Sequence, residues 1–296
     1  APRFEGAVTL SAPAQKGKAA EPPWRVAAKV KTDYSAARLD QVEVTYGAEE
    51  RALKLAGTGD IRFGAAPLLR AALSARQLDA DKFVASKDNS AEPMRAWPAL
   101  RTLVAGIPHL PIPAQVELAS EQVMLGGRPL QDITAELHGD TTSWRAHRLE
   151  FRAPGATRVS LRGADTKNVA PDQFKAALNI ESSDPDALLT WLQGRSDVAF
   201  RSQKPLRLRG DVTMTPDGFA IDAMRADIDG GPVEGRVGLS HRRADKGSRI
   251  DAELKAERLD LDAATAVVRS VIGPQGEWPD EGQLSLNIGR AIPAGQ

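Results

Sequence analysis

The stretch LLRAALSARQLDAD, residues 68–81, decides the fold, because the phrase returns as RIDAELKAERLDLD at residues 249–262. Both copies place apolar residues at every second position and end in Asp-x-Asp. A third, more diverged copy, FKAALNIESSDPD, lies at 174–186. Period-two alternation is typical of a strand with one buried face and one solvated face, and Asp caps helix starts. Each copy therefore predicts a long strand followed by the start of a helix.

Alternation of this kind recurs along most of the chain, and short turns rich in Gly, Pro, Asp or Asn separate the segments. We expect a mostly β fold: a long antiparallel meander of diverged strand repeats that forms a curved, groove-like sheet. Besides the repeated phrases, the predicted strands cover residues 6–10, 24–32, 40–46, 51–57, 60–64, 114–120, 122–126, 132–139, 147–153, 158–163, 174–180, 205–215, 219–229, 233–240 and 282–288.

Helical signals are few, and we expect two or three short helices. The segment DPDALLTWLQG carries Asp and Pro at its start and Gly at its end, which predicts a helix near 184–193. A similar pattern predicts a helix near 262–272, and a weaker one, interrupted by Pro98, lies near 92–107. Trp97 and Trp191 are expected to anchor their helices to the sheet.

The repeats divide the chain into units that we expect to share one continuous sheet. Unit boundaries are predicted at 1–113, 114–204 and 205–281, with a further unit beginning at 282–296. The last segment starts another strand-like phrase, so we expect the chain to be an excerpt of a longer protein.

Composition excludes several classes of function. The chain has 39 Lys+Arg and 39 Asp+Glu, and this zero net charge argues against a nucleic-acid partner. With no cysteine and only four histidines, none paired at helical spacing, a zinc site is not expected. Nucleophile-elbow, P-loop and dinucleotide-binding motifs are absent from the sequence, so we expect no catalytic residues, no cofactor and no enzymatic activity.

Two sets of polar residues have alternative explanations. The Asp-x-Asp pairs could hold a metal or act as catalytic carboxylates, but their recurrence at predicted helix starts favours capping. The histidines 138 and 147 flank a predicted turn and could meet across a hairpin, although surface polar residues are the simpler interpretation. The Asp pairs are Asp79/Asp81, Asp184/Asp186 and Asp260/Asp262.

The L-x-A-x-x-L-D-x-D phrase and the run at 116–163 together resemble the AsmA-like family of Gram-negative envelope proteins. The run has an alternating strand, a G-x-x-L-x-D-I hairpin, a W-x-x-x-x-L strand and a P-G-A-x-x-x-x-L-x-G segment. Its matching residues are Gly127, Leu130, Asp132, Ile133, Trp144, Leu149, Pro154, Gly155, Leu161 and Gly163. The family's N-terminal membrane anchor does not appear in this chain.

This resemblance implies a periplasmic segment of a protein tethered to the inner membrane by a part outside this chain. It further implies that the segment binds or conducts phospholipid or other acyl chains along a hydrophobic β-groove, in support of lipid transport and outer-membrane assembly. It leaves the identity of any envelope protein partners open.

Geometry independently limits how the apolar side of such a sheet is covered. A helix about 10 Å wide covers roughly two strands at ~4.8 Å spacing, so three short helices leave much of that side without cover. An ordinary packed core remains the alternative, as in a structural or interaction β-sandwich or barrel, and it is the commoner role of alternating strands. The candidate groove-lining residues are Leu69, Ala71, Leu73, Ala75, Phe174, Ala176, Leu178, Ile180, Ile250, Ala252, Leu254 and Ala256.

Overall fold

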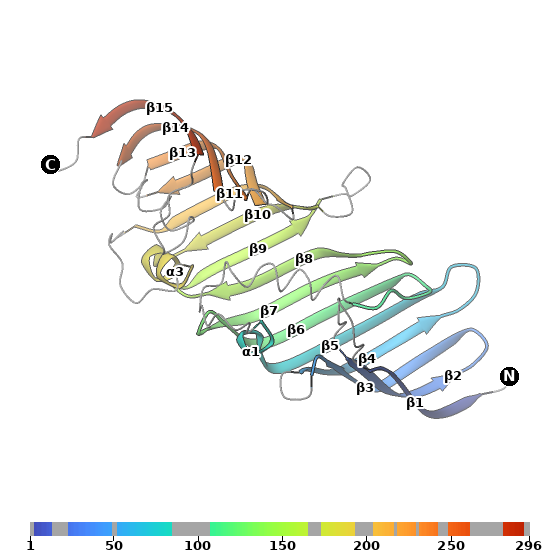
Figure 1. The fold of residues 1–296 in the computed structure, drawn as a ribbon. Coiled ribbons are helices and arrows are strands. Elements are labelled where there is room, and N and C mark those ends of the chain that lie inside the picture. The colour runs from blue at the N-terminus through green and yellow to red at the C-terminus, as the bar shows by residue number, and fades with distance from the viewer. Residues whose placement is uncertain are drawn as a thin grey trace. The chain divides into compact units, whose positions relative to one another are not determined.

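The chain folds almost wholly into strands in a computed structural model (Figure 1). The structure describes residues 3–13, 23–48, 52–84, 107–164, 173–192, 204–215, 218–228, 231–241, 248–260 and 281–292. The strands are β1 (Phe4–Ala12), β2 (Trp24–Thr32), β3 (Ala36–Tyr46), β4 (Leu53–Arg62), β5 (Leu68–Asp79), β6 (Ala114–Leu125), β7 (Arg128–Gly139), β8 (Trp144–Ala153), β9 (Thr157–Gly163), β10 (Phe174–Ser182), β11 (Leu206–Thr215), β12 (Gly218–Ile228), β13 (Gly231–His241), β14 (Ser248–Asp260) and β15 (Glu281–Ile292).

Strand order in the sheet is the order along the chain, β1 through β15. The β1–β2, β2–β3, β3–β4, β4–β5 and β6–β7 pairs are antiparallel, as are the successive pairs from β9 to β14. The predicted mostly β, largely antiparallel meander is therefore confirmed.

Two pairs break the meander, and both follow the repeated phrase. β5 pairs in parallel with β6, and β14 pairs in parallel with β15. The sequence analysis did not predict these two parallel pairs. Parallel neighbours require a connection that returns the chain to the strand's starting end, and the segments after β5 and β14 have the dozen or more residues that this needs. The repeated phrase thus marks the strand before a parallel crossover, whereas the third copy, β10, pairs antiparallel with β11.

The segments 51–57 and 60–64 were predicted as separate strands because of the glycines between them. They form the single strand β4. A Cβ on Gly57 would lie 1.9 Å from the carbonyl oxygen of Ala72, and one on Gly59 would lie 2.8 Å from that of Arg70. These glycines therefore permit close approach of β5 and do not form a turn. The segments predicted at 114–120 and 122–126 are likewise one strand, β6.

Two short helices follow the strands that end in Asp-x-Asp. Helix α1 (Ala80–Val84) continues directly from β5, and α3 (Pro185–Leu192) follows β10 where a helix near 184–193 was predicted. Pro185, Leu188, Thr190 and Trp191 of α3 are buried. The helices predicted near 92–107 and 262–272 lie outside the described residues, as does Trp97.

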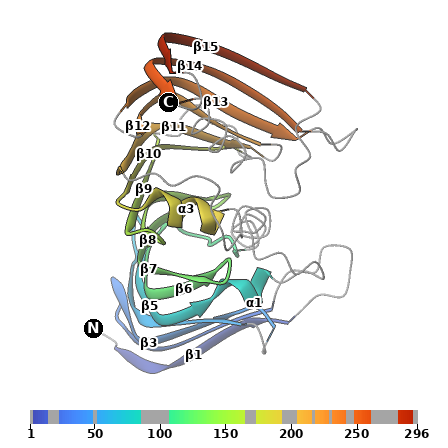
Figure 2. The same ribbon diagram turned by 90° about the vertical axis from the view of Figure 1, so that its left-hand side faces the viewer.

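The chain forms two compact units, and the boundary between them lies between Glu150 and Phe151, within β8. The first unit holds β1–β7 and the second holds β9–β15. In each unit the strands follow a curve, with the described helix on its inner side (Figure 2). Irregular registers contribute to the bending: Gln41 (φ +51°) lies in the shift of β3, and Ala223 (φ +47°) lies in the shift of β12.

Candidate functional site

One face of the first unit is built from rows of apolar residues. Directly opposed residues of paired strands share a face, so the register defines each row. The rows include Ile61–Leu69–Ala114, Leu39–Gly59–Ala71–Val116–Leu137 and Val42–Gly57–Leu73–Leu118–Ala135, and Ala75–Ser120–Ile133 belongs to the same face. Four predicted lining residues, Leu69, Ala71, Leu73 and Ala75, therefore lie together along β5.

This face is only partly covered although β4, β5 and β6 are interior strands. The four lining residues of β5 alternate strictly with exposed residues, yet each of them keeps part of its own surface accessible. Leu55 on β4 and Leu118 on β6 are also partly exposed. In this unit, the helical residues that the structure describes are the five of α1. Val42 and Ala114 in these rows are buried, so among the described residues the first unit presents an apolar surface that stays partly exposed along β4, β5 and β6.

The same apolar face continues to strand β1, where it is most accessible. Phe4, Val8 and Leu10 are 59%, 40% and 59% exposed. They lie opposite Thr32, Ala28 and Val26 of β2. Three large apolar side chains at the end of this face are thus exposed to solvent.

In the second unit, the predicted lining residues of β10 and β14 fall on shared rows. The register runs Ile180–Leu208–Ala226–Val233–Ala256 and Ala176–Val212–Ile221–Val237–Ala252 across β10–β14. Phe174 and Ile250 stand at the two ends of a third row, Phe174–Met214–Phe219–Leu239–Ile250. Leu178 lies opposite Gly210, and Leu254 lies opposite Gly235.

This second apolar face is packed more tightly than the first. Met224, Ala226, Val233 and Ala256 form a buried cluster, and Val233 is only 2% exposed. Leu254 and three other partly buried residues pack against this cluster. Ala176, Ala252 and Ala256 are buried, while Phe174, Leu178, Ile180 and Leu254 remain partly exposed. The buried cluster around Val233 is therefore an ordinary filled core, the alternative that the sequence analysis left open.

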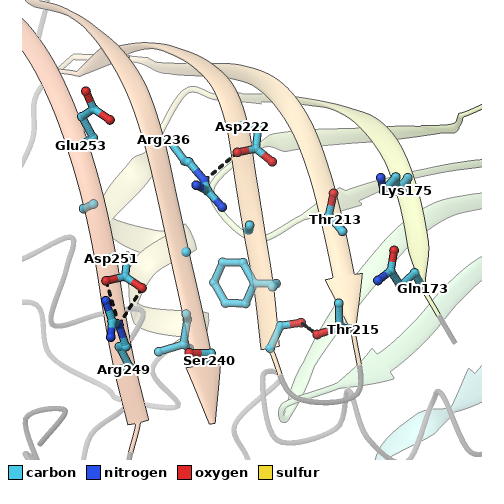
Figure 3. A pocket seen from close by; sticks show the side chains of 16 residues that line it. Gln173, Lys175, Thr213, Thr215, Asp222, Arg236, Ser240, Arg249, Asp251 and Glu253 are labelled. Carbon is cyan, nitrogen blue, oxygen red and sulfur yellow. Dashed lines mark hydrogen bonds and ion pairs between the residues drawn. The ribbon is translucent and has the colours of Figure 1, made fainter. Parts of the chain in front are cut away.

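The opposite face of each unit carries charge, and each of these polar faces has a hollow. Ion pairs such as Lys31–Glu5 (3.2 Å) and Arg236–Asp222 (2.7 Å) connect neighbouring strands there. A hollow of about 600 Å³ lies over β3–β7 and another of about 760 Å³ lies over β10–β14 (Figure 3). Sequence reasoning missed both, because polar alternation is shared by every solvated strand face.

The two histidines meet across the β7–β8 hairpin, which the sequence analysis gave as the less favoured alternative. The rings of His138 on β7 and His147 on β8 stack with centroids 4.8 Å apart and planes 6° apart. His138 Nε2 lies 2.7 Å from a carboxylate oxygen of Glu136. Within the part of the chain that the structure describes, no group of three or more His, Cys, Asp or Glu is arranged to hold a metal ion.

Capping by the Asp-x-Asp pairs is confirmed for their first members in two copies. Asp79 Oδ1 accepts a hydrogen bond from the Lys82 N–H at 2.9 Å, and Asp184 Oδ1 accepts one from the Ala187 N–H at 3.1 Å. Asp81 has a different role, because it binds the β6–β7 turn. For the third pair, the structure describes the backbone of Asp260, and Asp262 lies outside the described residues.

Two hairpin loops contain a recurrent Asp motif that the sequence analysis did not notice. In the β2–β3 loop, hydrogen bonds from the backbone and hydroxyl of Ser35 lower the pKa of Asp33. In the β7–β8 loop, the hydroxyl and backbone N–H of Thr142 lower the pKa of Asp140 to about 2. The sequences D-x-S-A and D-x-x-S gave a weak signal for such loops.

Electrostatics on the polar face of the second unit follow from close ion pairs. Arg249 Nε lies 2.9 Å from each carboxylate oxygen of Asp251, and this hydrogen bonding lowers the pKa of Asp251. Arg236, held by Asp222, contributes in the same direction. Arg249 and Arg236 therefore favour the ionised form of the Asp251 carboxyl.

Of the helices in the described ranges, neither is long or apolar enough to cross a membrane. Comparison with known proteins gave no match to a protein-family model, to a curated protein or to a solved structure.

Proposed function

We propose that this chain is a non-enzymatic lipid-binding segment whose apolar sheet face holds acyl chains. The observation that supports this most strongly is the partial exposure of Leu55, Leu73 and Leu118 on the interior strands of the first unit. A side chain in the centre of a packed domain core would be sealed by a second layer. An acyl chain that lies along these rows would bury its own surface and that of the leucines. Such burial contributes about 0.8 kcal/mol of binding free energy per CH₂.

The dimensions of the face suit such a ligand. The seven strands β1–β7 have six spacings of ~4.8 Å, which gives an apolar surface of about 29 Å across the strands. One leaflet of a bilayer has a hydrocarbon depth of about 15 Å, half of the core thickness. Acyl chains of ordinary length thus fit within the first unit, with head groups remaining in solvent.

The resemblance to AsmA-like proteins supports the finer version of the proposal. In that version the segment is periplasmic and is connected to the inner membrane by a part outside this chain. It carries phospholipid, and so supports outer-membrane assembly. No nucleic acid, metal or cofactor takes part in this mechanism.

A structural or interaction module is the second candidate, and one observation favours it. The cluster around Val233 in the second unit is a filled core of the kind that a scaffolding β-domain needs. If lipid is found only on the first unit, the two roles divide between the units.

The experiment uses two neighbouring residues of β5 that point to opposite faces. Leu73→Glu places a charge in the apolar rows, whereas Ala72→Glu places the same charge on the exposed polar face. With a photoreactive fatty acid or phospholipid, labelling of Leu73→Glu is expected to fall by about tenfold or more, since a carboxylate beside an acyl chain loses its hydration. Ala72→Glu is expected to label like the wild type.

Native mass spectrometry of the purified chain complements the labelling. Co-purified phospholipid supports the proposal, and a lipid-free mass with no extractable lipid contradicts it. Equal labelling of Leu73→Glu and Ala72→Glu, with both variants folded by circular dichroism, would show that this face is not the binding surface. Leu254 is unsuitable for the same test because it packs against the buried cluster of the second unit.

A further inference from the structure

We propose that the hollow on the polar face of β10–β14 binds a neutral carbohydrate chain. Its volume of about 760 Å³ is within the range of sites for small molecules, roughly 300–1,000 Å³. Its polar lining, such as Lys175, Asp222 and Glu253, lies on the side of the sheet opposite the apolar rows (Figure 3). Phe219, Leu239 and Ala252 of those rows also border it. Its ligand is therefore distinct from the acyl chains of the proposed function.

The floor of the hollow contains a glycine that the fold itself does not require. Gly238 lies inside β13, and a Cβ built on it would meet nothing closer than the Ala220 Cβ at 3.8 Å. Its φ is outside the left-handed region. By contrast, a Cβ on Gly218 would lie 2.0 Å from the Leu239 carbonyl oxygen, so packing demands glycine there. Glycine weakens a strand interior, and an unneeded one marks a place where a ligand approaches the backbone.

The charges that border the hollow balance, and four of the six form ion pairs with one another. Three cations and three carboxylates line it, so it offers no net attraction to a phosphate or to a cationic ligand. Arg236 is held by Asp222 at 2.7 Å, and Arg249 is held by Asp251 at 2.9 Å. Guanidinium groups donate hydrogen bonds and carboxylates accept them. A sugar hydroxyl does both, so donors and acceptors that lie side by side match a polyhydroxyl ligand.

The ends of the hollow indicate an extended ligand. The Lys175 ammonium on β10 and the Glu253 carboxylate on β14 have no ion-pair or hydrogen-bond partner among the described residues. Their strands are four spacings apart, about 19 Å. Hydroxyl groups of Thr213, Thr215 and Ser240 lie between the two ends. A chain of several sugar units reaches both ends, whereas a single sugar does not.

The test uses the whole chain with maltohexaose, cellohexaose and chitohexaose as probes. Amide chemical shifts are followed by NMR, and affinities are measured by calorimetry. At least one saccharide is expected to move the amide signals of Ala220, Gly238 and Asp251 in a saturable manner. Added NaCl is expected to leave the affinity unchanged, because the ligand carries no charge.

Filling the floor provides the decisive variant. Gly238→Val occupies the hollow with a residue that favours strands, so it is expected to melt no lower than the wild type and to bind at least about tenfold more weakly. Gly238→Ala adds a single methyl group and is expected to lower the saccharide affinity less than Gly238→Val does. The matched control is Ala177→Val, on an exposed position of the same face outside the hollow.

Three results would overturn the proposal. The first is that none of the three saccharides shifts these amides at millimolar concentration. The second is that a saccharide binds equally to wild type, Gly238→Val and Gly238→Ala. The third is that inorganic phosphate, and no saccharide, produces the shifts, which would indicate an anion site. None of these outcomes depends on lipid binding by the apolar rows.

Discussion

The carboxylate of Asp81 accepts a hydrogen bond from the backbone N–H of Gly126 at 2.7 Å. Its second oxygen accepts one from the next amide, Gly127, at 2.9 Å. Both glycines have positive φ, +63° and +69°, which is the geometry of a two-residue type I′ hairpin turn. One aspartate in α1 thereby holds the β6–β7 hairpin, 45 residues further along the chain.

Asp81→Ala is expected to lower the free energy of unfolding by about 1–2 kcal/mol, because two charge-assisted hydrogen bonds are lost from a partly exposed site. Urea denaturation measures the loss, and faster amide exchange at Gly126 and Gly127 localises it. Lys82→Ala, which removes only an exposed ion pair with Asp79, is the control and is expected to change stability by less than about 0.5 kcal/mol. Unchanged exchange at both glycines in Asp81→Ala would contradict this account.

Gly155 in the β8–β9 turn is expected to tolerate no side chain. Its φ is +81°, and a Cβ would lie 2.1 Å from the Asp184 carbonyl oxygen at the start of α3. Gly155→Ala should therefore destabilise by more than about 2 kcal/mol, from backbone strain together with displacement of α3. Gly64→Ala is the matched control: its φ is +100° but nothing lies within 4 Å, so only strain of about 1 kcal/mol is expected. Chemical denaturation checks both, and equal losses would show that the contact with α3 is unimportant.

Asp140 is expected to make the β7–β8 loop sensitive to acid. Its pKa is lowered from 3.8 to about 2 by Thr142 and Ser143, so ionisation favours the folded state. The resulting stabilisation is complete above the unfolded pKa and is lost as pH falls through about 2. Carbon-13 NMR should show a carboxyl midpoint near 2. The stability gap between wild type and Asp140→Ala should narrow between about pH 4 and pH 2. A constant gap across this interval would rule out the loop hydrogen bonds as its source.

Two valine substitutions distinguish a packed apolar position from an open one. Val233 in the second unit is 2% exposed, and Val8 on the first unit's apolar face is 40% exposed. Val233→Ala is expected to cost about 2–3 kcal/mol, since two buried methyl groups and their packing are lost. Val8→Ala is expected to cost less than about 0.5 kcal/mol. Thermal or urea unfolding measures both, and similar losses would mean that the two positions do not differ in packing.

Much of the fold was accessible from local sequence. Alternation located nearly all strands, and the Asp, Pro and Gly pattern predicted α3 and the caps at Asp79 and Asp184. The positions of His138 and His147 on either side of a turn allowed their contact, although the sequence analysis preferred separate surface residues. These features depend on neighbours within a few residues or across one tight hairpin, so the sequence carries them directly.

The remaining features depend on distant parts of the chain. Alternation assigns each side chain to a face, but it does not determine strand direction, so the parallel β5–β6 and β14–β15 pairs were not foreseen. It also does not determine how strongly a sheet curves. The sequence therefore predicted both Leu73 and Ala256 as groove-lining residues. In the folded chain, tertiary packing leaves Leu73 partly exposed and buries Ala256. The hollow above Gly238 also depends on tertiary structure. A missing side chain leaves a cavity only where side chains of the neighbouring strands surround the space.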